Sequence, residues 1–417
     1  MQLADSIFRS SSRHLLKHLE QHLADKNLPL KVKLWTGEEY SVAASARTEV
    51  ALCTPRALLA LAHPTLGSLA RSYVEQEIDL SGDARDIVEL GERLCSTAPS
   101  RGAKPGAAAR GSRHTRSTDR RAVSYHYDVS NDFYRLWLDE RLVYSCAYFR
   151  ADGDTLDAAQ LQKLDHICRK LELKPGERFL DIGCGWGALV IHAAQRYGVR
   201  ALGVTLSRNQ HEYAAREIAS RGLRERCEVR LVDYRDIPEA EPYDKIASVG
   251  MFEHVGIANF PTYFGKIRRL LKPGDLLMNH GITSAGPGES GDSPDFGDFI
   301  GEYVFPDGEL AHVSRVIAAM SAQGLECVDA ESLRRHYAKT LWHWVSRLEA
   351  HKAQAVALVG EKKYRIWRIY MAGSAWSFER GWLSVYQLLA GRPDRAGRLC
   401  RSLTRVHVYS AGVPDAE

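Results

Sequence analysis

The sequence lacks the features that mark membrane-spanning proteins, disulfide scaffolds and zinc knuckles. Its 417 residues contain no apolar run near the roughly 18–20 residues of a spanning helix, and no continuous apolar stretch typical of a signal peptide. The eight cysteines include no CxxC pair, so we expect no metal site and mostly buried, apolar cysteines. The net charge is only +4, so whole-chain charge predicts no nucleic-acid partner. We therefore expect a cytoplasmic protein.

The composition is that of a globular protein, with 45% hydrophobic and 26% charged residues. At roughly 150 residues per domain, the length predicts two or three domains. Changes in composition predict an N-terminal accessory domain over residues 1–95, a basic linker over 96–121 and a larger domain over 122–417.

The first 23 residues have apolar side chains at helical spacing, with basic residues such as Arg9, Arg13 and Lys17 between them. Two interpretations remain open for this predicted helix. It packs against its own domain, or it lies on an anionic membrane surface as a basic amphipathic helix.

The linker contains seven basic residues and one acidic residue, a net charge of +6, and no large apolar residue over 97–121. This composition predicts a flexible segment. It serves as a solvated tether, or it is attracted to lipid phosphates. RNA binding is less favoured because aromatic residues for base stacking are missing.

Strand and helix patterns alternate from residue 122 onward, which predicts a parallel, doubly wound α/β sheet. A helix ends at Tyr197, a capping box pairs Ser207 with Gln210, and a helix over 263–271 ends at a Pro-Gly pair. An aromatic helical stretch between the last two predicted strands would cover the sheet. The predicted strands are 178–182, 199–206, 228–232, 245–249, 276–282, 325–330 and 404–409.

A glycine-rich turn follows the first of these strands and opens a helix, as in proteins that bind a dinucleotide or S-adenosylmethionine. Asp181 precedes Gly183, Gly185 and Gly187. A carboxylate there would repel a pyrophosphate but stabilise the amine of a methionine. The next strand also ends without the carboxylate that a NAD protein would place there. The turn therefore favours S-adenosylmethionine.

The missing carboxylate also departs from the commonest methyltransferase pattern, in which an acidic residue binds the ribose hydroxyls. The second strand ends at Thr205-Leu206, and we expect Thr205 and Gln210 to supply polar contacts instead. The residues after the third strand, where the adenine ring would lie, are Asp233, Tyr234 and Arg235.

Beyond this turn, the chain resembles the cyclopropane-fatty-acyl-phospholipid synthases and the related mycolic acid cyclopropane synthases. The resemblance covers most of 122–410, whereas the first 95 residues match only loosely. It implies a class I methyltransferase fold, with a mostly parallel seven-stranded sheet and a helical cap. The matching stretches are HYDVSNDFYRLWLD at 126–139, YSCAYF at 144–149, LDIGCGWG at 180–187, GVTLSRNQ at 203–210, GMFEHVG at 250–256, HGI at 280–282 and HYAKTLWHW at 336–344.

The resemblance implies transfer of a methyl group from S-adenosylmethionine to a cis double bond in a phospholipid acyl chain, which forms a cyclopropane ring. An alkene attacks the methyl group without a general base and leaves a carbocation. The site should therefore be apolar, dry and lined by aromatic faces. Ring closure needs a proton acceptor, and the resemblance implies a bound bicarbonate ion.

The resemblance also implies roles for individual residues. Tyr144 and Ser145 would lie near the cofactor, and Gly250 would leave room beside it. Cys146 and Ile282 would hold bicarbonate through their backbone. The residues carried over as holders of the ion are Cys146, Glu253, His280, Ile282 and Tyr337.

Each of these residues alone also has a structural explanation. Cys146 fits a buried small residue, Tyr337 a helix-packing residue and His280 a strand-end histidine with its hydrogen bonds satisfied. Their occurrence together in matched motifs favours function. Ser374 stands where many family members carry cysteine. Because the alkene mechanism needs no enzyme nucleophile, we expect this difference to be tolerated.

Three further functions remain open: a sibling enzyme that makes methyl- or methylene-branched acyl lipids, a methyltransferase for a small polar molecule, and a non-enzymatic lipid- or RNA-binding protein. The favoured interpretation implies a membrane phospholipid substrate and peripheral contact with the inner face of the membrane. The resemblance also implies a homodimer. We expect no metal and no nucleic-acid partner.

Overall fold

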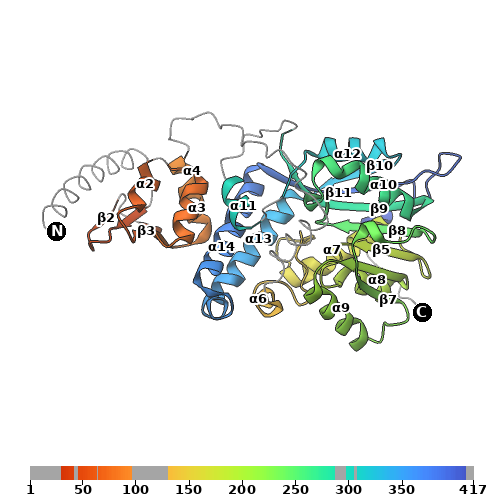
Figure 1. Ribbon diagram of the computed structural model, residues 1–417, viewed down its shortest axis with the longest axis horizontal. Coiled ribbons are helices and arrows are strands. Elements are labelled where there is room, and N and C mark those ends of the chain that lie inside the picture. The colour runs from red at the N-terminus through yellow and green to blue at the C-terminus, as the bar shows by residue number, and fades with distance from the viewer. Residues whose placement is uncertain are drawn as a thin grey trace. The chain divides into compact units, whose positions relative to one another are not determined.

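The computed structural model describes residues 30–41, 46–62, 64–95, 130–286, 297–304 and 308–409 (Figure 1). These residues form two compact units. The first unit takes in the described parts of Met1–Ala107, Ser293–Val304 and Val359–Trp376, and the second takes in the remainder. The predicted helix within residues 1–23 and the predicted linker over 96–121 lie outside the described residues.

The first unit contains a four-stranded sheet. Its strands are β1 (Leu30–Lys33), β2 (Glu39–Ser41), β3 (Thr48–Leu52) and β4 (Ile78–Ser81). Its helices are α2 (Ala57–Ala62), α3 (Leu66–Val74), α4 (Ala84–Cys95), α11 (Gly297–Tyr303) and part of α14 (Lys352–Arg380). The strand order is β2-β1-β3-β4, with β1 parallel to β3 and the other pairs antiparallel. All four strands lie within residues 1–95, for which the sequence predicts a separate domain.

Two later segments of the chain complete the first unit, although the sequence places them in the larger domain. The segment Val359–Trp376, which lies on α14, is bound to the rest of this unit by two arginines. The Arg365 guanidinium donates to the carbonyls of Tyr73 and Ile78, and the Arg368 guanidinium donates to the Tyr73 hydroxyl. Both arginines are buried. Such contacts between residues nearly 300 positions apart leave no local signal in the sequence.

The second unit contains a seven-stranded sheet (Figure 1). Its strands are β5 (Arg178–Ile182), β6 (Arg200–Thr205), β7 (Cys227–Leu231), β8 (Tyr243–Val249), β9 (Leu271–Ser284), β10 (Glu326–Ser332) and β11 (Leu383–Gly391). The strand order is β10-β11-β9-β8-β5-β6-β7. The pairs from β9 to β7 are parallel, and β11 is antiparallel to both of its neighbours. This arrangement confirms the predicted mostly parallel, doubly wound sheet.

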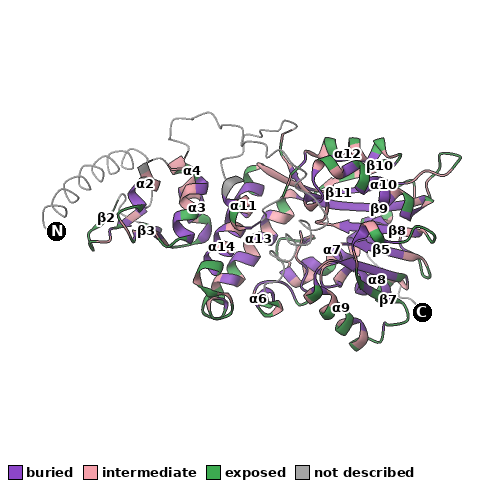
Figure 2. Cartoon of the chain, in the orientation of Figure 1, coloured by how far each residue is buried: buried purple, intermediate pink, exposed green. Residues whose placement is uncertain are grey.

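Helices cover both faces of this sheet. They are α6 (Asn131–Arg135), α7 (Leu156–Lys170), α8 (Ala188–Tyr197), α9 (Arg208–Ser220), α10 (Phe260–Leu270), α12 (Val313–Ala322), α13 (Arg334–Ala350) and α15 (Val406–Tyr409). Short 3₁₀ turns are η1 (Tyr234–Asp236), η2 (Phe252–His254) and η3 (Ile257–Asn259). Alternate strand residues enter opposite cores: Phe179 packs with α7 and α8, and Leu180 packs with α10 and α12. Burial is therefore continuous along the central strand β5 from Phe179 to Ile182, whereas the edge strands β7 and β10 keep exposed positions (Figure 2).

Two predictions near the C-terminus are wrong. The last strand is β11, which lies inside the predicted helical stretch, and the predicted strand over 404–409 contains helix α15 instead. β11 pairs with β9 over nine residues, from Leu383↔Ser284 to Gly391↔Leu276. A strand buried between two others shows no polar-apolar alternation, so its sequence resembles a buried helix.

Two smaller predictions also need correction. The Pro273-Gly274 pair does not end the preceding helix as a turn, because β9 begins at Leu271 and includes both residues. Only four of the eight cysteines are buried, and all eight are free thiols. In the described part of the chain, no helix is both long and apolar enough to cross a bilayer.

Candidate active site

The glycine-rich turn joins β5 to α8 in backbone conformations that favour glycine. Gly183, Gly185 and Gly187 have φ values of 79°, 54° and 86°. The N–H groups of Gly183 and Cys184 both donate to the Val204 carbonyl at 3.0 Å, which holds the turn against β6. The turn thus places backbone at the carboxyl edge of the parallel sheet, where such folds bind ligands.

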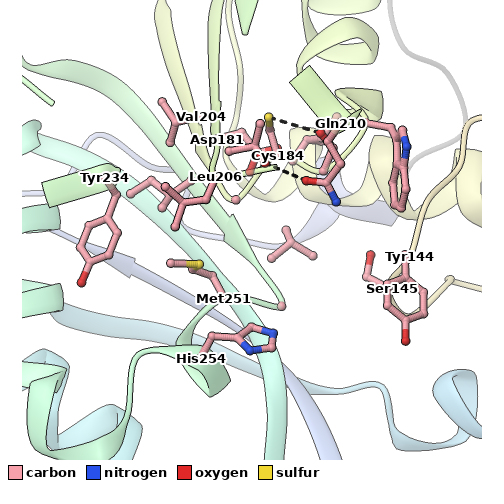
Figure 3. Close-up of a pocket in the computed structure, with 18 of the residues that line it drawn as sticks. Tyr144, Ser145, Asp181, Cys184, Val204, Leu206, Gln210, Tyr234, Met251 and His254 are labelled. Atoms are coloured by element: carbon pink, nitrogen blue, oxygen red, sulfur yellow. Dashed lines mark hydrogen bonds between the residues drawn. The ribbon is translucent and has the colours of Figure 1, made fainter. Parts of the chain in front are cut away.

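This turn borders a cavity of about 160 Å³. Tyr144 and Ser145 lie on one side of it, and Tyr234 and Met251 lie on the other (Figure 3). Eleven of the twelve predicted cofactor residues line the cavity, together with Gly250. They are Tyr144, Ser145, Asp181, Gly183, Gly185, Thr205, Leu206, Gln210, Asp233, Tyr234 and Arg235.

Gly187, the twelfth, does not line the cavity. It is the N-cap of α8, and a Cβ there would lie 3.0 Å from the Ala214 Cβ. The structure therefore explains Gly187 by its positive φ and by close packing of α8 against α9.

Two acidic residues line the cavity, Asp181 at the end of β5 and Asp233, and of these Asp181 forms no ion pair with a described residue. It is 2% exposed, and its Oδ1 has no hydrogen-bond partner among the described residues. Burial raises its pKa to about 7, and the positive charge of Lys163 opposes this rise. A buried, unpartnered carboxylate that faces a cavity fits a cationic amine, such as that of S-adenosylmethionine.

Thr205 and Gln210 bond to each other along the cavity wall. The Thr205 hydroxyl donates to Gln210 Oε1 at 2.7 Å and accepts from the Ser207 N–H at 3.1 Å. The Ser207 hydroxyl accepts from the Gln210 N–H at 3.3 Å, which confirms Ser207 as the N-cap of α9. The predicted capping box is wrong, because the Gln210 side chain contacts Thr205 rather than the Ser207 backbone.

Asp233 and Arg235 neutralise each other beside Tyr234. The Arg235 guanidinium donates to the Asp233 carboxylate at 2.6 and 2.8 Å, and its carbon lies 5.5 Å from the Tyr234 ring centre. This arrangement presents an aromatic ring to the cavity next to a neutralised ion pair, which suits a flat, uncharged heterocycle such as adenine.

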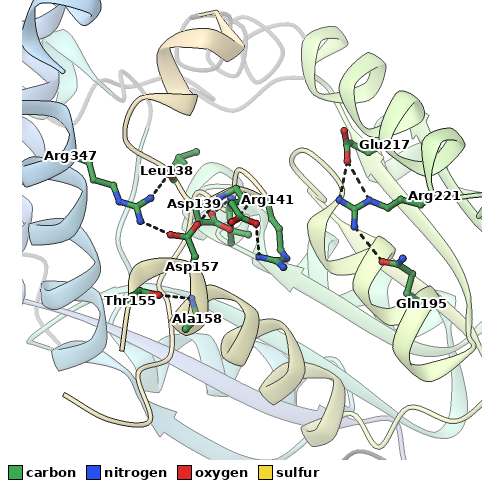
Figure 4. Close-up of polar contacts among 12 residues, drawn as sticks. Leu138, Asp139, Arg141, Thr155, Asp157, Ala158, Gln195, Glu217, Arg221 and Arg347 are labelled. Atoms are coloured by element: carbon green, nitrogen blue, oxygen red, sulfur yellow. Dashed lines mark hydrogen bonds and ion pairs between the residues drawn. The ribbon is translucent and has the colours of Figure 1, made fainter. Parts of the chain in front are cut away.

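The segment that carries Tyr144 and Ser145 is held in place by side chains. Asp139 accepts the N–H groups of Arg141 and Val143 at 3.1 and 2.7 Å. From α13, Arg347 donates to the Leu138 carbonyl and to the Asp157 carboxylate (Figure 4). These contacts hold the segment before substrate or cofactor arrives.

A second group of predicted residues lies next to the cavity, where β9 ends. Glu253 on η2 accepts the Ile282 N–H through Oε1 at 2.7 Å. The His280 carbonyl accepts the Gly250 N–H at 2.8 Å, which joins this group to the cavity wall. Gln387 on β11 places its amide nitrogen 3.3 Å from His280 Nδ1. Nδ1 then accepts, and Nε2 carries the ring hydrogen.

The free atoms of this group are buried and unpartnered. Within the described ranges, neither Glu253 Oε2 nor His280 Nε2 has a hydrogen-bond partner. Burial raises the pKa of Glu253 to about 7 and lowers the pKa of His280 to about 3. His280 is therefore neutral at neutral pH, and Glu253 holds a proton more readily than an ordinary glutamate.

Cys146 and Tyr337 reach this group through the backbone. The Cys146 thiol lies 3.7 Å from the Leu333 carbonyl, which also accepts the Tyr337 N–H at 3.0 Å. The Leu333 N–H in turn donates to the Val385 carbonyl on β11. Val385 pairs with Ile282 on the neighbouring strand β9, so this chain of contacts ends at Ile282. Burial raises the pKa of the Cys146 thiol, so this cysteine stays uncharged.

A row of aromatic rings extends from the cofactor cavity to Tyr337. The ring centres of Tyr144 and Trp344 are 5.3 Å apart, and those of Trp344 and Tyr337 are 6.0 Å apart. Tyr337 then contacts Phe378 at 4.7 Å. Of these four residues only Tyr144 lines the cavity, and Trp344, which contacts it, is fully buried.

Sequence reasoning missed Lys163 and Gln387. Both are buried and both contact predicted site residues: Lys163 Nζ lies 2.9 Å from Ser145 Oγ, and Gln387 contacts His280. A signal existed for each, because each is a polar residue within an otherwise buried stripe or strand. Ser374 lies on α14 within the first unit.

Comparisons with known proteins agree with this site. A family model described as mycolic acid cyclopropane synthetase matches residues 114–388. A "probable fatty acid methyltransferase" of Pseudomonas putida is 42% identical over 395 residues, covering 95% of this chain and 100% of that protein. Cyclopropane mycolic acid synthase 1 of Mycobacterium tuberculosis is 39% identical over 274 residues, covering 64% of this chain and 94% of that protein.

The solved structures give the same picture. The crystal structure of mycolic acid cyclopropane synthase CmaA1 complexed with SAH and CTAB has a TM-score of 0.62 and 37% identity, covering 65% of this chain and 98% of that chain. The family model covers more than half of the sequence, and the buried Asp181 carboxylate fits the cofactor's amine. The chain therefore belongs to the mycolic acid cyclopropane synthetase family of S-adenosylmethionine-dependent methyltransferases.

Proposed function

We propose that the chain methylates the cis double bond of an unsaturated phospholipid acyl chain and closes a cyclopropane ring there. The observation that carries this proposal is the aromatic row of Tyr144, Trp344 and Tyr337 beside the cofactor cavity. Attack by an alkene leaves positive charge on carbon, and aromatic faces stabilise such a charge where water is excluded. S-adenosylmethionine supplies the methyl group as an electrophile.

The chain's own residues bind and orient the reactants in this proposal. Asp181 holds the cofactor's amine. Tyr234, with the Asp233–Arg235 pair behind it, offers a surface to the adenine ring. The held segment with Tyr144 and Ser145 forms the side of the cavity next to the aromatic row. The acyl double bond would lie against that row.

We further propose that Glu253 and His280 hold a bicarbonate ion, which accepts the proton released on ring closure. The support is their pair of buried free atoms, because the His280 Nε2 hydrogen and a protonated Glu253 both donate to an anion. The Ile282 N–H already donates to Glu253, so it orients the carboxyl group. In this proposal Cys146 and Tyr337, which both contact the Leu333 carbonyl, are further holders of the ion.

A second product is favoured by one observation. The Pseudomonas putida relative that this chain matches over its whole length is described as a fatty acid methyltransferase. If a separate hydride donor reduces the same cation, the product is a methyl-branched acyl chain. If a 1,2-hydride shift moves the charge to the methyl-bearing carbon and a methyl proton is then lost, the product is a methylene-branched chain. This alternative uses the same cofactor residues and the same aromatic row.

A lipid substrate also requires contact with a bilayer. We propose peripheral association with the inner face of the membrane, through residues 1–121. The support is their sequence alone: helical spacing of apolar residues near the start, and a linker of net charge +6.

Expression in a bacterium that lacks ring lipids tests the function. Fatty acids are analysed by gas chromatography and NMR, because ring and methylene products share a mass. We expect cyclopropane acyl chains, and a markedly smaller amount from a matched Asp181→Asn variant. Branched chains would establish the alternative. Unchanged lipids, from a purified protein that still binds S-adenosylmethionine, would contradict both and favour a small polar substrate.

A further inference from the structure

Lys163 on α7 is a buried lysine whose Nζ lies within ion-pair distance of no carboxylate in the described part of the chain. It is 2% exposed, and its Nζ donates to the neutral Ser145 hydroxyl at 2.9 Å. Lys170 lies two turns further along the same helix and is equally buried, but it forms an ion pair with Glu331 at 2.5 Å. A hydroxyl supplies a hydrogen bond but no opposite charge, so burial of Lys163 is costly until an anion arrives.

The position of Lys163 indicates where that anion would lie. Lys163, Ser145 and Asp181 all line the cofactor cavity. Burial lowers the pKa of Lys163, while Asp139, Cys146 and Asp181 raise it. Burial raises the pKa of Asp181, while Lys163 lowers it. The cavity therefore contains a buried cation and a buried anion that act on each other without forming an ion pair.

This pair of charges complements the amino-acid end of the cofactor. That end is a zwitterion, in which the ammonium and the carboxylate are bonded to one carbon atom. A ligand whose ammonium binds Asp181 must place its carboxylate next to that point. The Ser145 hydroxyl accepts from Lys163, so its own hydrogen is free to donate to an oxygen in the cavity.

We propose that Lys163, together with the Ser145 hydroxyl, binds the α-carboxylate of S-adenosylmethionine. Lys163 and Asp181 then recognise the two charges of the zwitterion separately. The proposal rests on the family's cofactor and not on the lipid product proposed above, since it concerns the binding equilibrium alone.

Two other roles for Lys163 agree less well with the contacts. Holding the Tyr144–Ser145 segment in place is already the task of Gln160, whose amide donates to the carbonyls of Val143 and Ser145 at 3.2 and 2.9 Å. Binding bicarbonate would place Lys163 with Glu253 and His280, which do not line the cavity that Lys163 lines.

Calorimetry with the purified full chain and three ligands tests the proposal. The ligands are S-adenosylhomocysteine, its analogue without the carboxylate (S-adenosyl-3-thiopropylamine) and its analogue without the amine. We expect Lys163→Met to weaken binding of the two carboxylate-bearing ligands at least tenfold, and to leave the decarboxylated analogue within twofold. Asp181→Asn should show the opposite selectivity, with losses only for the two amine-bearing ligands.

Two further variants keep the test decisive. Ser145→Ala removes only the hydroxyl and should reduce affinity for the same two ligands as Lys163→Met, even if the latter fails to fold. Lys170→Met removes a buried lysine of the same helix, one that forms an ion pair with Glu331. This variant should leave the ratios of the three ligands' dissociation constants unchanged. Equal weakening of all three ligands by Lys163→Met and by Ser145→Ala would overturn the proposal and leave these residues a purely structural role.

Discussion

We expect Asp181 to make cofactor binding depend on pH. Its pKa is raised to about 7 by burial, and only the ionised carboxylate attracts the cofactor's amine. The affinity for S-adenosylhomocysteine should therefore fall as the pH decreases through 7, and Asp181→Asn should remove this dependence. At higher pH, the variant should bind at least tenfold more weakly, a loss of about 1.4 kcal/mol.

Calorimetry about one pH unit on each side of that pKa checks this prediction. The analogue without the amine serves as the control. It has no ammonium group for the Asp181 carboxylate to attract, so its affinity should not fall as the pH decreases. An affinity for S-adenosylhomocysteine that stays constant across this range would show that Asp181 does not contact the amine.

Glu253 and Tyr337 should act on turnover rather than on cofactor binding. Both lie in the group that we propose to hold the proton acceptor, outside the cofactor cavity. We expect Glu253→Gln and Tyr337→Phe each to lower turnover by about 10²–10⁴, the usual contribution of one acid–base step. Cofactor affinity, measured by calorimetry, should remain unchanged.

A matched control is Cys146→Ala, which should keep most of the turnover because Cys146 is expected to act through its backbone. A loss below about threefold for both test variants, when one acid–base step contributes far more, would argue against a proton acceptor held in this way.

At the scale of single residues, eleven of the twelve cofactor residues predicted from the sequence line the cavity, because the glycine turn and the strand ends follow local rules. Lys163 and Gln387 were missed for a physical reason. A polar residue in a buried stripe points into a cavity or bonds to a neighbouring element, and only the packed structure shows which group it meets. Whether Glu253, His280, Ile282, Cys146 and Tyr337 hold bicarbonate stays a prediction.

At the scale of elements, the end of β9 depends on a glycine. A Cβ at Gly281 would lie 2.2 Å from Phe252 Cε1 and 2.9 Å from Glu253 Oε1. Gly281→Ala should therefore displace η2, lower the free energy of unfolding by about 1–3 kcal/mol and reduce turnover. Thermal unfolding and the fatty-acid assay measure the two effects.

Gly301→Ala on α11 is the control, because a Cβ there meets no atom within 4 Å. It should leave the unfolding temperature unchanged or slightly higher, since alanine favours helix more than glycine does. If Gly281→Ala and the native chain have equal free energies of unfolding, η2 moves aside without loss of stability, and Glu253 is not rigidly held.

The predicted strands agree with the observed ones where the sequence carries local signals, and differ where it does not. The strands that end at the cofactor cavity were predicted to within a few residues, because each is followed by a turn signal and a helix. β11 was missed because its stability comes from β9 and β10, its neighbours in the sheet but not in the sequence. The segment over 404–409 has β-branched residues but forms no part of the sheet.

At the scale of the whole molecule, binding to membranes should depend on salt. Basic residues exposed on a linker attract anionic lipids over a screening distance of about 8–10 Å at physiological ionic strength. Binding of the purified chain to phosphatidylglycerol vesicles should decrease as salt increases. Neutralising the seven basic linker residues should weaken it without changing the affinity for S-adenosylhomocysteine.

Vesicle sedimentation measures this binding, and phosphatidylcholine vesicles are the uncharged control. Binding that salt leaves unchanged, or equal activity on bilayers after deletion of residues 1–121, would show that the methyltransferase domain reaches its lipid unaided. That region would then serve packing or dimerisation.

The sequence by itself determined the family, the doubly wound sheet and the position of the cofactor cavity. Those features depend on local requirements: glycine at positive φ, apolar runs in parallel strands, and a carboxylate at the end of β5. Only the tertiary structure decided which segments complete the first unit and which strand separates β9 from β10. It also decided which buried polar atoms remain without partners. These outcomes depend on long-range packing, in which a residue's role is determined by atoms distant in the chain.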